Sequence, residues 1–306
     1  MNRRQFLKQV AAWSSGAAMA IPVFHIARRA LGAQPATQQS VLAVARAKDY
    51  SAIVASAIGQ LGGIRQFVTS GSKVVVKPNI GWDRAPEYAA NTHPQVVQAI
   101  VKLCLEAGAA RVSVFDRSCN DPRRCYASSG IRAAVESLDD PRAVCPYVED
   151  RNFVPVTIKN GKAVSEWHLY RDALEADCYI NVPIAKHHSL TRLTLGLKNI
   201  MGICGGSRGK LHSQIAQKLA DLNSVVRPKL TVVDATRILV RHGPQGGNLD
   251  DVEVRDTIIA STDPVAADAY ATTLFGLKPE QIETTVAAYR AGLGEMDLSK
   301  VRIIQV

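Results

Sequence analysis

The chain has 306 residues and a hydrophobic content of 47%, enough for a sizeable core in one large domain or two modest ones. Aromatic residues make up 6% of the chain, too few for a surface that stacks the bases of single-stranded nucleic acid. The formal net charge is +10, but five basic residues and no acid lie in residues 1–33, so the remainder does not indicate a nucleic-acid-binding protein.

The first residues are typical of an export signal. Residues 2–8, NRRQFLK, resemble the twin-arginine signal, and a weakly apolar span at 10–26 follows them. This span is too short and too polar for a membrane helix, and a small-residue cleavage site stands at 30–32. We therefore expect residues 1–33 to be a signal peptide, residues 34–40 to be a linker and the protein to be periplasmic, with no stable membrane span after processing. The alternative is a basic amphipathic segment that stays on the protein.

The resemblance to a twin-arginine signal also bears on cofactors. That route carries folded proteins, and much of its cargo acquires a cofactor before export. We therefore expect a metal ion or an organic cofactor, and a redox partner is one of the partners to consider.

Strands and helices alternate along the chain, and each type is predicted from its hydrophobic period and its flanking residues. The predicted strands are 41–45, 73–77, 111–115, 145–148, 154–158, 178–182, 229–233, 254–260 and 301–306. The predicted helices are 50–67, 92–108, 129–138, 169–176, 209–226, 263–276 and 279–291. Thr92 is the predicted cap of its helix, and Asn160-Gly161 is the predicted turn of a hairpin.

This alternation predicts an α/β fold with a doubly wound, mostly parallel sheet in a three-layer sandwich. The near-continuous apolar run Val74-Val75-Val76 is typical of a strand buried on both faces. Residues 41–306 would form a single domain, with a small β-containing insertion near 140–170.

Polar residues follow four of the predicted strands. Lys77 and Asn79 end one, Asp116 ends the next, Asn181 belongs to a third and Asp234 ends a fourth. In an open α/β sheet the carboxyl ends of the strands share one edge, where ligands bind. We therefore expect these side chains to converge on one crevice.

The stretch from Asp177 to Gly206 is the richest in polar groups. Pro183 should end its buried strand, because proline has no N–H to give to a ladder. Polar and basic side chains then alternate with aliphatic ones, which is typical of the lining of a half-buried site. They are Lys186, His187, His188, Thr191, Arg192, Thr194, Lys198 and Asn199.

The sequence contains, in this order, VVVKPN at 74–79, NVPIAKH at 181–187, LGLKNIMG at 195–202, His212, the strand at 228–234, Gly243-Pro244 and DPVAAD at 263–268. Together these features resemble a known family, the domain of unknown function 362. The likeness covers about residues 70–280 in order. It supports the domain and the polar positions but implies no reaction. Some longer members of that family resemble iron–sulfur proteins because they carry added ferredoxin-type cysteines. This chain lacks those cysteines, so an iron–sulfur cluster is the less expected cofactor.

Two hypotheses about function remain open. The first is a metal- or cofactor-assisted enzyme acting on a small anionic substrate, with a link to redox chemistry as one option. Its expected catalytic residues are Lys77, Lys186, Lys198 and Asp234, and its expected metal ligands are His187, His212 and Asp116. Its expected substrate-binding residues are Asn79, Asn181, Thr191, Asn199, Gly202 and Gly243. The second is a periplasmic protein that binds an anion or cofactor without turning it over.

Familiar motifs and paired cysteines are missing from the sequence. The sequence contains no G-x-S-x-G, no H-E-x-x-H and no G-x-G-x-x-G after a strand, and residues 205–210 fail the phosphate-loop pattern. None of the six cysteines forms a C-x-x-C pair. Cys119 and Cys125 are the pair that an oxidising compartment would most readily join.

Overall fold

The computed structural model describes residues 39–306, so the predicted signal peptide and most of the predicted linker lie outside the described residues. A ten-stranded sheet forms the middle layer, with its main path in the order β12-β1-β11-β10-β7-β2-β3-β4. Strand β8 pairs with β10, and β9 pairs with β8. Its strands are β1 Val41–Arg46, β2 Lys73–Pro78, β3 Arg111–Val114, β4 Ala143–Val144, β7 Cys178–Val182, β8 Ile184–His188, β9 Arg192–Thr194, β10 Leu230–Leu239, β11 Val252–Ser261 and β12 Arg302–Gln305.

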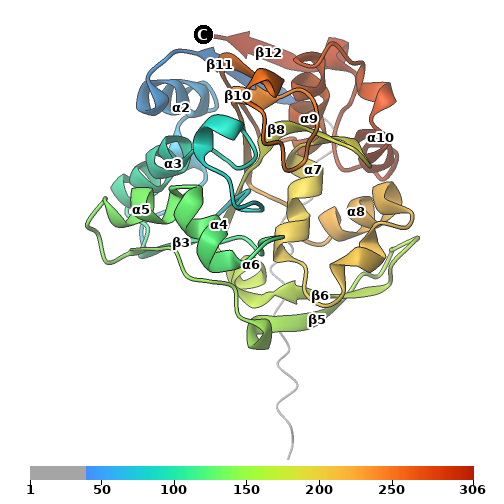
Figure 1. Ribbon diagram of the computed structural model, residues 1–306, viewed down its shortest axis with the longest axis horizontal. Coiled ribbons are helices and arrows are strands. Elements are labelled where there is room, and N and C mark those ends of the chain that lie inside the picture. Colours follow the sequence, from blue (N-terminus) through green and yellow to red (C-terminus); the bar gives the residue numbers. More distant parts are fainter. Residues whose placement is uncertain (1–38) are drawn as a thin grey trace, which may run out of the picture. The chain divides into compact units, whose positions relative to one another are not determined.

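Most neighbouring strands of the sheet are parallel, and the antiparallel pairs are β1–β11, β10–β11 and β8–β9. One face is covered by α2 Tyr50–Gly59, α3 Pro94–Glu106, α4 Pro122–Ser128 and α5 Ile131–Glu136. The other is covered by α6 Arg171–Glu175, α7 Gly196–Asn199, α8 Ile215–Asn223, α9 Pro264–Thr273, α10 Glu283–Arg290 and the hairpin β5 Phe153–Thr157 and β6 Glu166–Tyr170. This arrangement confirms the predicted three-layer, mostly parallel α/β fold (Figure 1).

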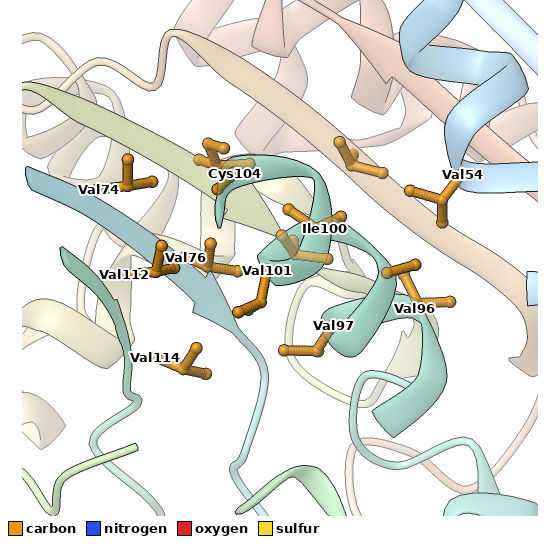
Figure 2. Close-up of a cluster of buried hydrophobic side chains, with 14 of the residues drawn as sticks. Val54, Val74, Val76, Val96, Val97, Ile100, Val101, Cys104, Val112 and Val114 are labelled. Atoms are coloured by element: carbon orange, nitrogen blue, oxygen red, sulfur yellow. The ribbon is translucent and has the colours of Figure 1, made fainter. Parts of the chain in front are cut away.

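The β-branched run of β2 shows why the sheet can be buried on both sides. Val74 and Val76 pack with α3 and its neighbours on one face, whereas Val75 belongs to the core on the other face. Figure 2 shows Ile100 and Val101 of α3 beside the valines of β2. Successive side chains of a strand therefore point into different cores, and only polar residues on the same face of the sheet can meet in one site.

Several predicted boundaries are wrong for local reasons. Helix α2 ends at Gly59, because the chain turns at Gly62 and Gly63, whose φ angles of +93° and +82° favour glycine. The cap of α3 is His93, whose Nδ1 accepts from the N–H of Gln95, while the Thr92 hydroxyl donates to the carbonyl of Val182. Thr92 therefore ties the entry of α3 to β7.

The region predicted as an insertion is divided between two sheets. The short strand β4 joins the edge of the main sheet beside β3, whereas β5 and β6 pair only with each other. The loop between β5 and β6 is fixed to α8, because Asp221 accepts hydrogen bonds from the N–H groups of Ala163 and Val164. Among residues 39–306, none of the helices has the length and apolar character needed to cross a bilayer.

The six cysteines are all free thiols in the structure. Cys119 is exposed and Cys125 is buried, and the disulfide that we considered between them is not formed.

Candidate functional site

A pocket of about 500 Å³ opens where the chain leaves β2 and β3, beside β8 and α7. Its volume suits a small molecule. Its polar and basic lining residues are Lys77, Asn79, Asp116, Arg117, Cys119, Lys186, His188, Ser189, Thr194, Lys198, Asn199, Arg208 and His212. Its remaining lining residues are Gly81, Trp82, Leu190, Met201, Gly202, Gly209 and Pro244.

The strand that we expected to end at Pro183 is followed at once by a second strand, β8. Strand β8 pairs with β9 so that Lys186 lies opposite Thr194. Alternation along β8 places Lys186 and His188 on one side and His187 on the other. Lys186 and His188 line the pocket, whereas His187 accepts a hydrogen bond on Nδ1 from the N–H of Gly243, 3.1 Å away.

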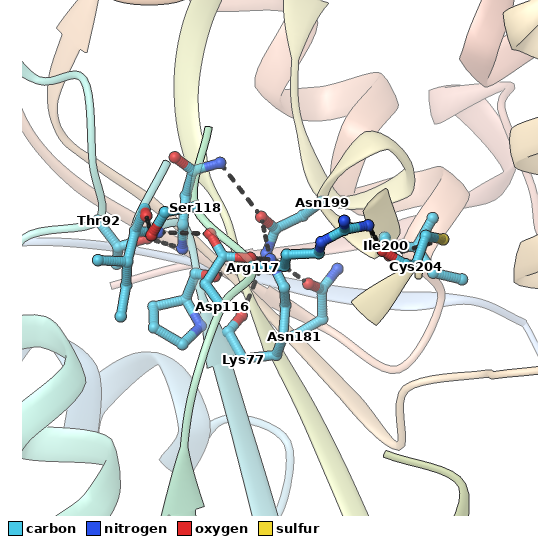
Figure 3. A network of polar contacts seen from close by, with 12 residues as sticks. Lys77, Thr92, Asp116, Arg117, Ser118, Asn181, Asn199, Ile200 and Cys204 are labelled. Carbon is cyan, nitrogen blue, oxygen red and sulfur yellow. Dashed lines mark hydrogen bonds and ion pairs between the residues drawn. The ribbon is translucent and has the colours of Figure 1, made fainter. Parts of the chain in front are cut away.

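Lys77 is the anchored lysine of the site, buried with 1% of its surface exposed. Its Nζ lies 2.8 Å from each of three acceptors, which are the carbonyl of Pro78, Oδ1 of Asn199 and Oδ1 of Asp116. Burial lowers the pKa of Lys77, and the Asp116 carboxylate opposes that shift. Because three acceptors match the three N–H bonds of an ammonium group, we assign Lys77 as a fixed positive charge (Figure 3).

The absence of a side chain at Gly202 allows this ion pair to form. A Cβ at Gly202 would lie 1.7 Å from Oδ1 of Asp116 and 2.4 Å from Nζ of Lys77. The N–H of Arg117 also donates to the carbonyl of Gly202 over 2.9 Å, so the backbone there lies directly over the pair. Gly202 therefore has a packing role, and it also belongs to the pocket lining, where we predicted a substrate-binding role.

Lys186 is equally buried but less completely bonded. Its Nζ donates to Oδ1 of Asn79 and to the carbonyl of Ala90, and it lies 6.0 Å from the ring centroid of Trp82. Burial and, to a smaller extent, the charge of Lys198 lower the pKa of Lys186 to about 7. Two acceptors account for both N–H bonds of a neutral amine, which leaves its lone pair without a protein partner in the described part of the chain.

Lys198 has no oxygen acceptor for its Nζ within residues 39–306. The recorded contact is with the sulfur of Met201 at 3.7 Å. The side chain is partly buried, and burial together with the charges of Arg208 and Lys77 lowers its pKa to about 8. This lysine is therefore available to a ligand.

Two neutral donors face the same pocket. Nδ1 of His188 accepts from the N–H groups of Leu190 and Thr191, so its neutral ring carries the proton on Nε2. Burial, followed by the charge of Lys198, lowers the pKa of His188 to about 3. The hydroxyl of Thr194, a residue only 4% exposed, has no hydrogen-bond partner among the described residues. Both groups can donate to an oxyanion.

The helix that carries Lys198 and Asn199 is held from two sides. Asp268 of α9 accepts hydrogen bonds from the N–H groups of Gly196 and Leu197, at 2.7 and 2.9 Å. Asn181 accepts from the amide of Asn199 and donates to the carbonyl of Gly196. Asn181 therefore positions α7 and does not line the pocket.

The structure brings eight of the predicted site residues to the pocket lining: Lys77, Asn79, Asp116, Lys186, Lys198, Asn199, Gly202 and His212. It places the others elsewhere: Asn181, Thr191, His187, Asp234 and Gly243. The Thr191 hydroxyl donates to the carbonyl of Leu193, and a Cβ at Gly243 would lie 1.9 Å from the carbonyl oxygen of His187. These two positions therefore shape the loops around β8.

Asp234 does not line the pocket, in contrast to its predicted catalytic role. It follows Val232 by two positions in β10, and Val232 packs in the core beneath α2 and α3. Its carboxylate accepts from the N–H of His93 at 2.7 Å and from the N–H and hydroxyl of Thr236. Asp234 is thus a buried anchor for the start of α3.

The predicted metal ligands are not brought together. His187 faces away from the pocket, and Nδ1 of its ring is already occupied by the N–H of Gly243. Within residues 39–306, no group of three or more His, Cys, Asp or Glu side chains is placed to hold a metal ion. The trio of His187, His212 and Asp116 therefore does not form a ligand set.

Some lining residues were not among the predicted site residues. Trp82 and Cys119 come from loops after β2 and β3, and Arg208 is fixed by donating to the carbonyls of Arg117 and Ser118. In the sequence, only the position of Trp82 and Cys119 shortly after two predicted strand ends could have indicated that they belong to the site. Arg208 lies far along the chain and had no such signal.

Comparisons with known proteins identify relatives but no reaction. A thylakoid-associated protein of Synechocystis sp. is 28% identical over 241 residues, which are 76% of this chain and 72% of that protein. The lactate racemase apoprotein of Thermoanaerobacterium thermosaccharolyticum and a protein from Thermotoga maritima are each 11% identical, with TM-scores of 0.48 and 0.43. This chain contributes 74% of its length to each match and spans 55% and 59% of those two structures.

The family assignment rests on a match that covers more than half of the chain. Residues 74–273 match the family described as Domain of unknown function (DUF362). The matched range includes β2, β3, β7, β8 and α7, which together build the pocket. The chain therefore belongs to the DUF362 family.

Proposed function

We propose that the protein is an enzyme that binds a small anion in this pocket and uses Lys186 to move a proton to or from it. The observation that carries the proposal is the state of Lys186 Nζ, which is buried, bonded to two fixed acceptors and free at its third position. A lysine whose pKa is about 7 is partly unprotonated at neutral pH, so it can act as base and, once protonated, as acid.

The charge of the pocket favours an anionic substrate. Its lining includes five basic side chains and one carboxylate, Asp116, which is paired with Lys77. The Nε2–H of His188 and the hydroxyl of Thr194 add two neutral donors. This set suits a carboxylate group, whose oxygens accept several hydrogen bonds and carry negative charge.

The same arrangement supports removal of a proton from carbon. When a base takes a proton from a carbon beside a carboxylate or carbonyl, negative charge moves onto oxygen. The fixed charge of Lys77 and the charge of Lys198 lie where they would stabilise it, in a pocket partly walled by Trp82 and Met201. Such proton transfer by a positioned group contributes about 10²–10⁴ in rate.

The test is exchange of substrate hydrogen with solvent. Purified protein is incubated in D₂O with a panel of small 2-oxo, 3-oxo and amino acids, and deuterium uptake is followed by NMR. We expect catalysed exchange of at least one acid, reduced about 100-fold or more in Lys186→Met. Lys159→Gln changes an exposed lysine and serves as the control. Equal exchange by wild type and Lys186→Met would refute the role of Lys186.

A binding protein without turnover remains the second candidate, because Lys198, His188 and Thr194 offer donors without any need for a base. A binding protein of this kind would show a raised melting temperature with the same acids, and none of the acids would take up deuterium.

We also propose export by the twin-arginine route, supported by the run NRRQFLK at residues 2–8. Fusion of residues 1–40 to a reporter should direct it out of the cytoplasm, and replacement of Arg3 and Arg4 by lysine should retain it inside. A reporter exported equally by both fusions would refute the proposal.

A further inference from the structure

The two lysines nearest the free part of the pocket have different bonding, and this difference suggests different tasks. Lys186 is bonded to Asn79 and Ala90, so its amine has little freedom to move. Lys198 stands on the short helix α7, and the recorded contact of its Nζ is the weak acceptor sulfur of Met201, 3.7 Å away. An amine without fixed partners can approach an electrophile without breaking protein hydrogen bonds.

We infer that Lys198 is a nucleophile that forms a Schiff base with the carbonyl carbon of a 2-oxo acid bound in this pocket. The inference rests on the proposed function and names its substrate class. A 2-oxo acid carries a carboxylate beside its carbonyl, and both groups match what the pocket offers. The hydroxyl of Thr194 and the Nε2–H of His188 suit the carboxylate, while Lys198 is left for the carbonyl.

The surroundings of Lys198 increase the fraction of its unprotonated form, which is the nucleophilic one, relative to an exposed lysine. Burial and the positive charges of Arg208 and Lys77 oppose a further positive charge at its Nζ. Desolvation and a neighbouring cation are the two general means by which proteins activate lysine for this chemistry. The one carboxylate of the lining, on Asp116, is already paired with Lys77 and does not offset them.

The step balances with the groups present. The lone pair of Lys198 Nζ attacks the carbonyl carbon, a C–N bond forms, and the carbonyl π pair moves onto oxygen. Two protons from the amine nitrogens, one of Lys198 and one of protonated Lys186, leave with that oxygen as water. A C=N⁺ bond that keeps one hydrogen remains, and Lys186 is left neutral. No oxidant or reductant is needed, and water reverses the step.

The neutral Lys186 is then placed for the proton transfer proposed above. An iminium group makes the hydrogens on the adjacent carbon more acidic, because its positive nitrogen accepts the electron pair. Lys186 and Lys198 line the same pocket, so one bound substrate can meet both amines. One lysine would thus hold the substrate covalently while the other moves its proton.

The test is reductive trapping. The protein is treated with sodium cyanoborohydride and pyruvate, glyoxylate or 2-oxoglutarate at about pH 7.5, digested, and mapped by mass spectrometry. We expect a secondary-amine adduct at Lys198, at least ten-fold above that at the exposed Lys159. Lys198→Arg keeps the charge but is not nucleophilic, and it should lose the adduct without loss of fold. Adducts spread over surface lysines, or none at Lys198 with any of the three acids, would overturn the inference.

The exchange experiment separates this inference from the proposed function. If Lys198→Arg exchanges 2-oxo acid hydrogens with D₂O as fast as wild type, the Schiff base is refuted while proton transfer by Lys186 stands. If Lys198→Arg loses exchange and wild type forms the adduct, both stand. If wild type forms the adduct but exchanges no acid, the Schiff base stands and proton transfer by Lys186 fails.

Discussion

The substitution Gly202→Ala tests the packing of the site with a single added methyl group. The new Cβ would lie 1.7 Å from Oδ1 of Asp116 and 2.4 Å from Cε and Nζ of Lys77. Neither partner has room to move, because Lys77 Nζ is also bonded to Pro78 and Asn199, and Oδ2 of Asp116 accepts from the N–H of Ile80 at 2.6 Å. The methyl group can be accommodated only if the ion pair separates.

The expected cost follows from the burial of that pair. Lys77 and Asp116 are 1% and 3% exposed, and breaking a buried, hydrogen-bonded pair costs about 3–5 kcal/mol. Urea unfolding followed by circular dichroism measures the change in the free energy of unfolding. Gly209→Ala is the matched control, since a Cβ at Gly209 would have no atom within 4 Å.

A double-mutant cycle locates the cost. In an Asp116→Ala background the closest clashing oxygen is gone, so Gly202→Ala should cost at least about 1 kcal/mol less than in wild type. A Gly202→Ala protein within about 0.5 kcal/mol of wild type would show that the site is not packed as described.

Three further predictions concern titration and Asp234. Folding lowers the pKa of Lys186 from 10.5 to about 7, so between these pH values the unfolded chain binds one more proton than the folded protein. The free energy of unfolding, measured with urea, should therefore increase from pH 7 to 10.5 in wild type relative to Lys186→Met. Burial lowers the pKa of His93 from 6.5 to about 4, so the free energy of unfolding should decrease as pH falls from 6.5 to 4. In His93→Asn this decrease should be smaller in the same urea measurements. Asp234→Ala should lower the free energy of unfolding by about 1–3 kcal/mol, because it leaves buried donors of His93 and Thr236 unpaired, while the melting-temperature shift with 2-oxo acids stays unchanged.

Most buried strands of the main sheet could be predicted from the sequence, because hydrophobic period and turn residues are local signals. The position of β8 could not be predicted from the sequence. Pro183 indicated the end of a strand, yet the chain resumes as a strand one residue later and pairs with β10 and β9. That pairing depends on residues far along the chain, and it alone fixes which side of β8 faces the pocket.

The same reasoning explains why Asp234 was assigned to the site and does not belong to it. The prediction used strand ends and ignored the face to which each side chain points. Lys77 lies opposite Asn181, and Asn181 lies opposite Thr231, so these three share one face of the sheet. Asp234 is three positions beyond Thr231 in β10, which places it on the other face with Val232. Counting positions from a paired residue would have separated the two groups.

The three lysines of the pocket differ in the number of oxygen acceptors around each amine. Lys77 has three oxygen acceptors, Lys186 has two, and Lys198 has none among residues 39–306. Three acceptors stabilise an ammonium group, two are compatible with a neutral amine held in place, and none leaves the amine to a ligand. Those acceptors come from loops and strands distant in the chain, so the sequence could mark all three lysines as polar site residues but could not rank them. The proposed division into a fixed charge, a base and a nucleophile therefore rests on tertiary structure. Exchanging the proposed roles of Lys186 and Lys198 would require new acceptors and not merely new lysines.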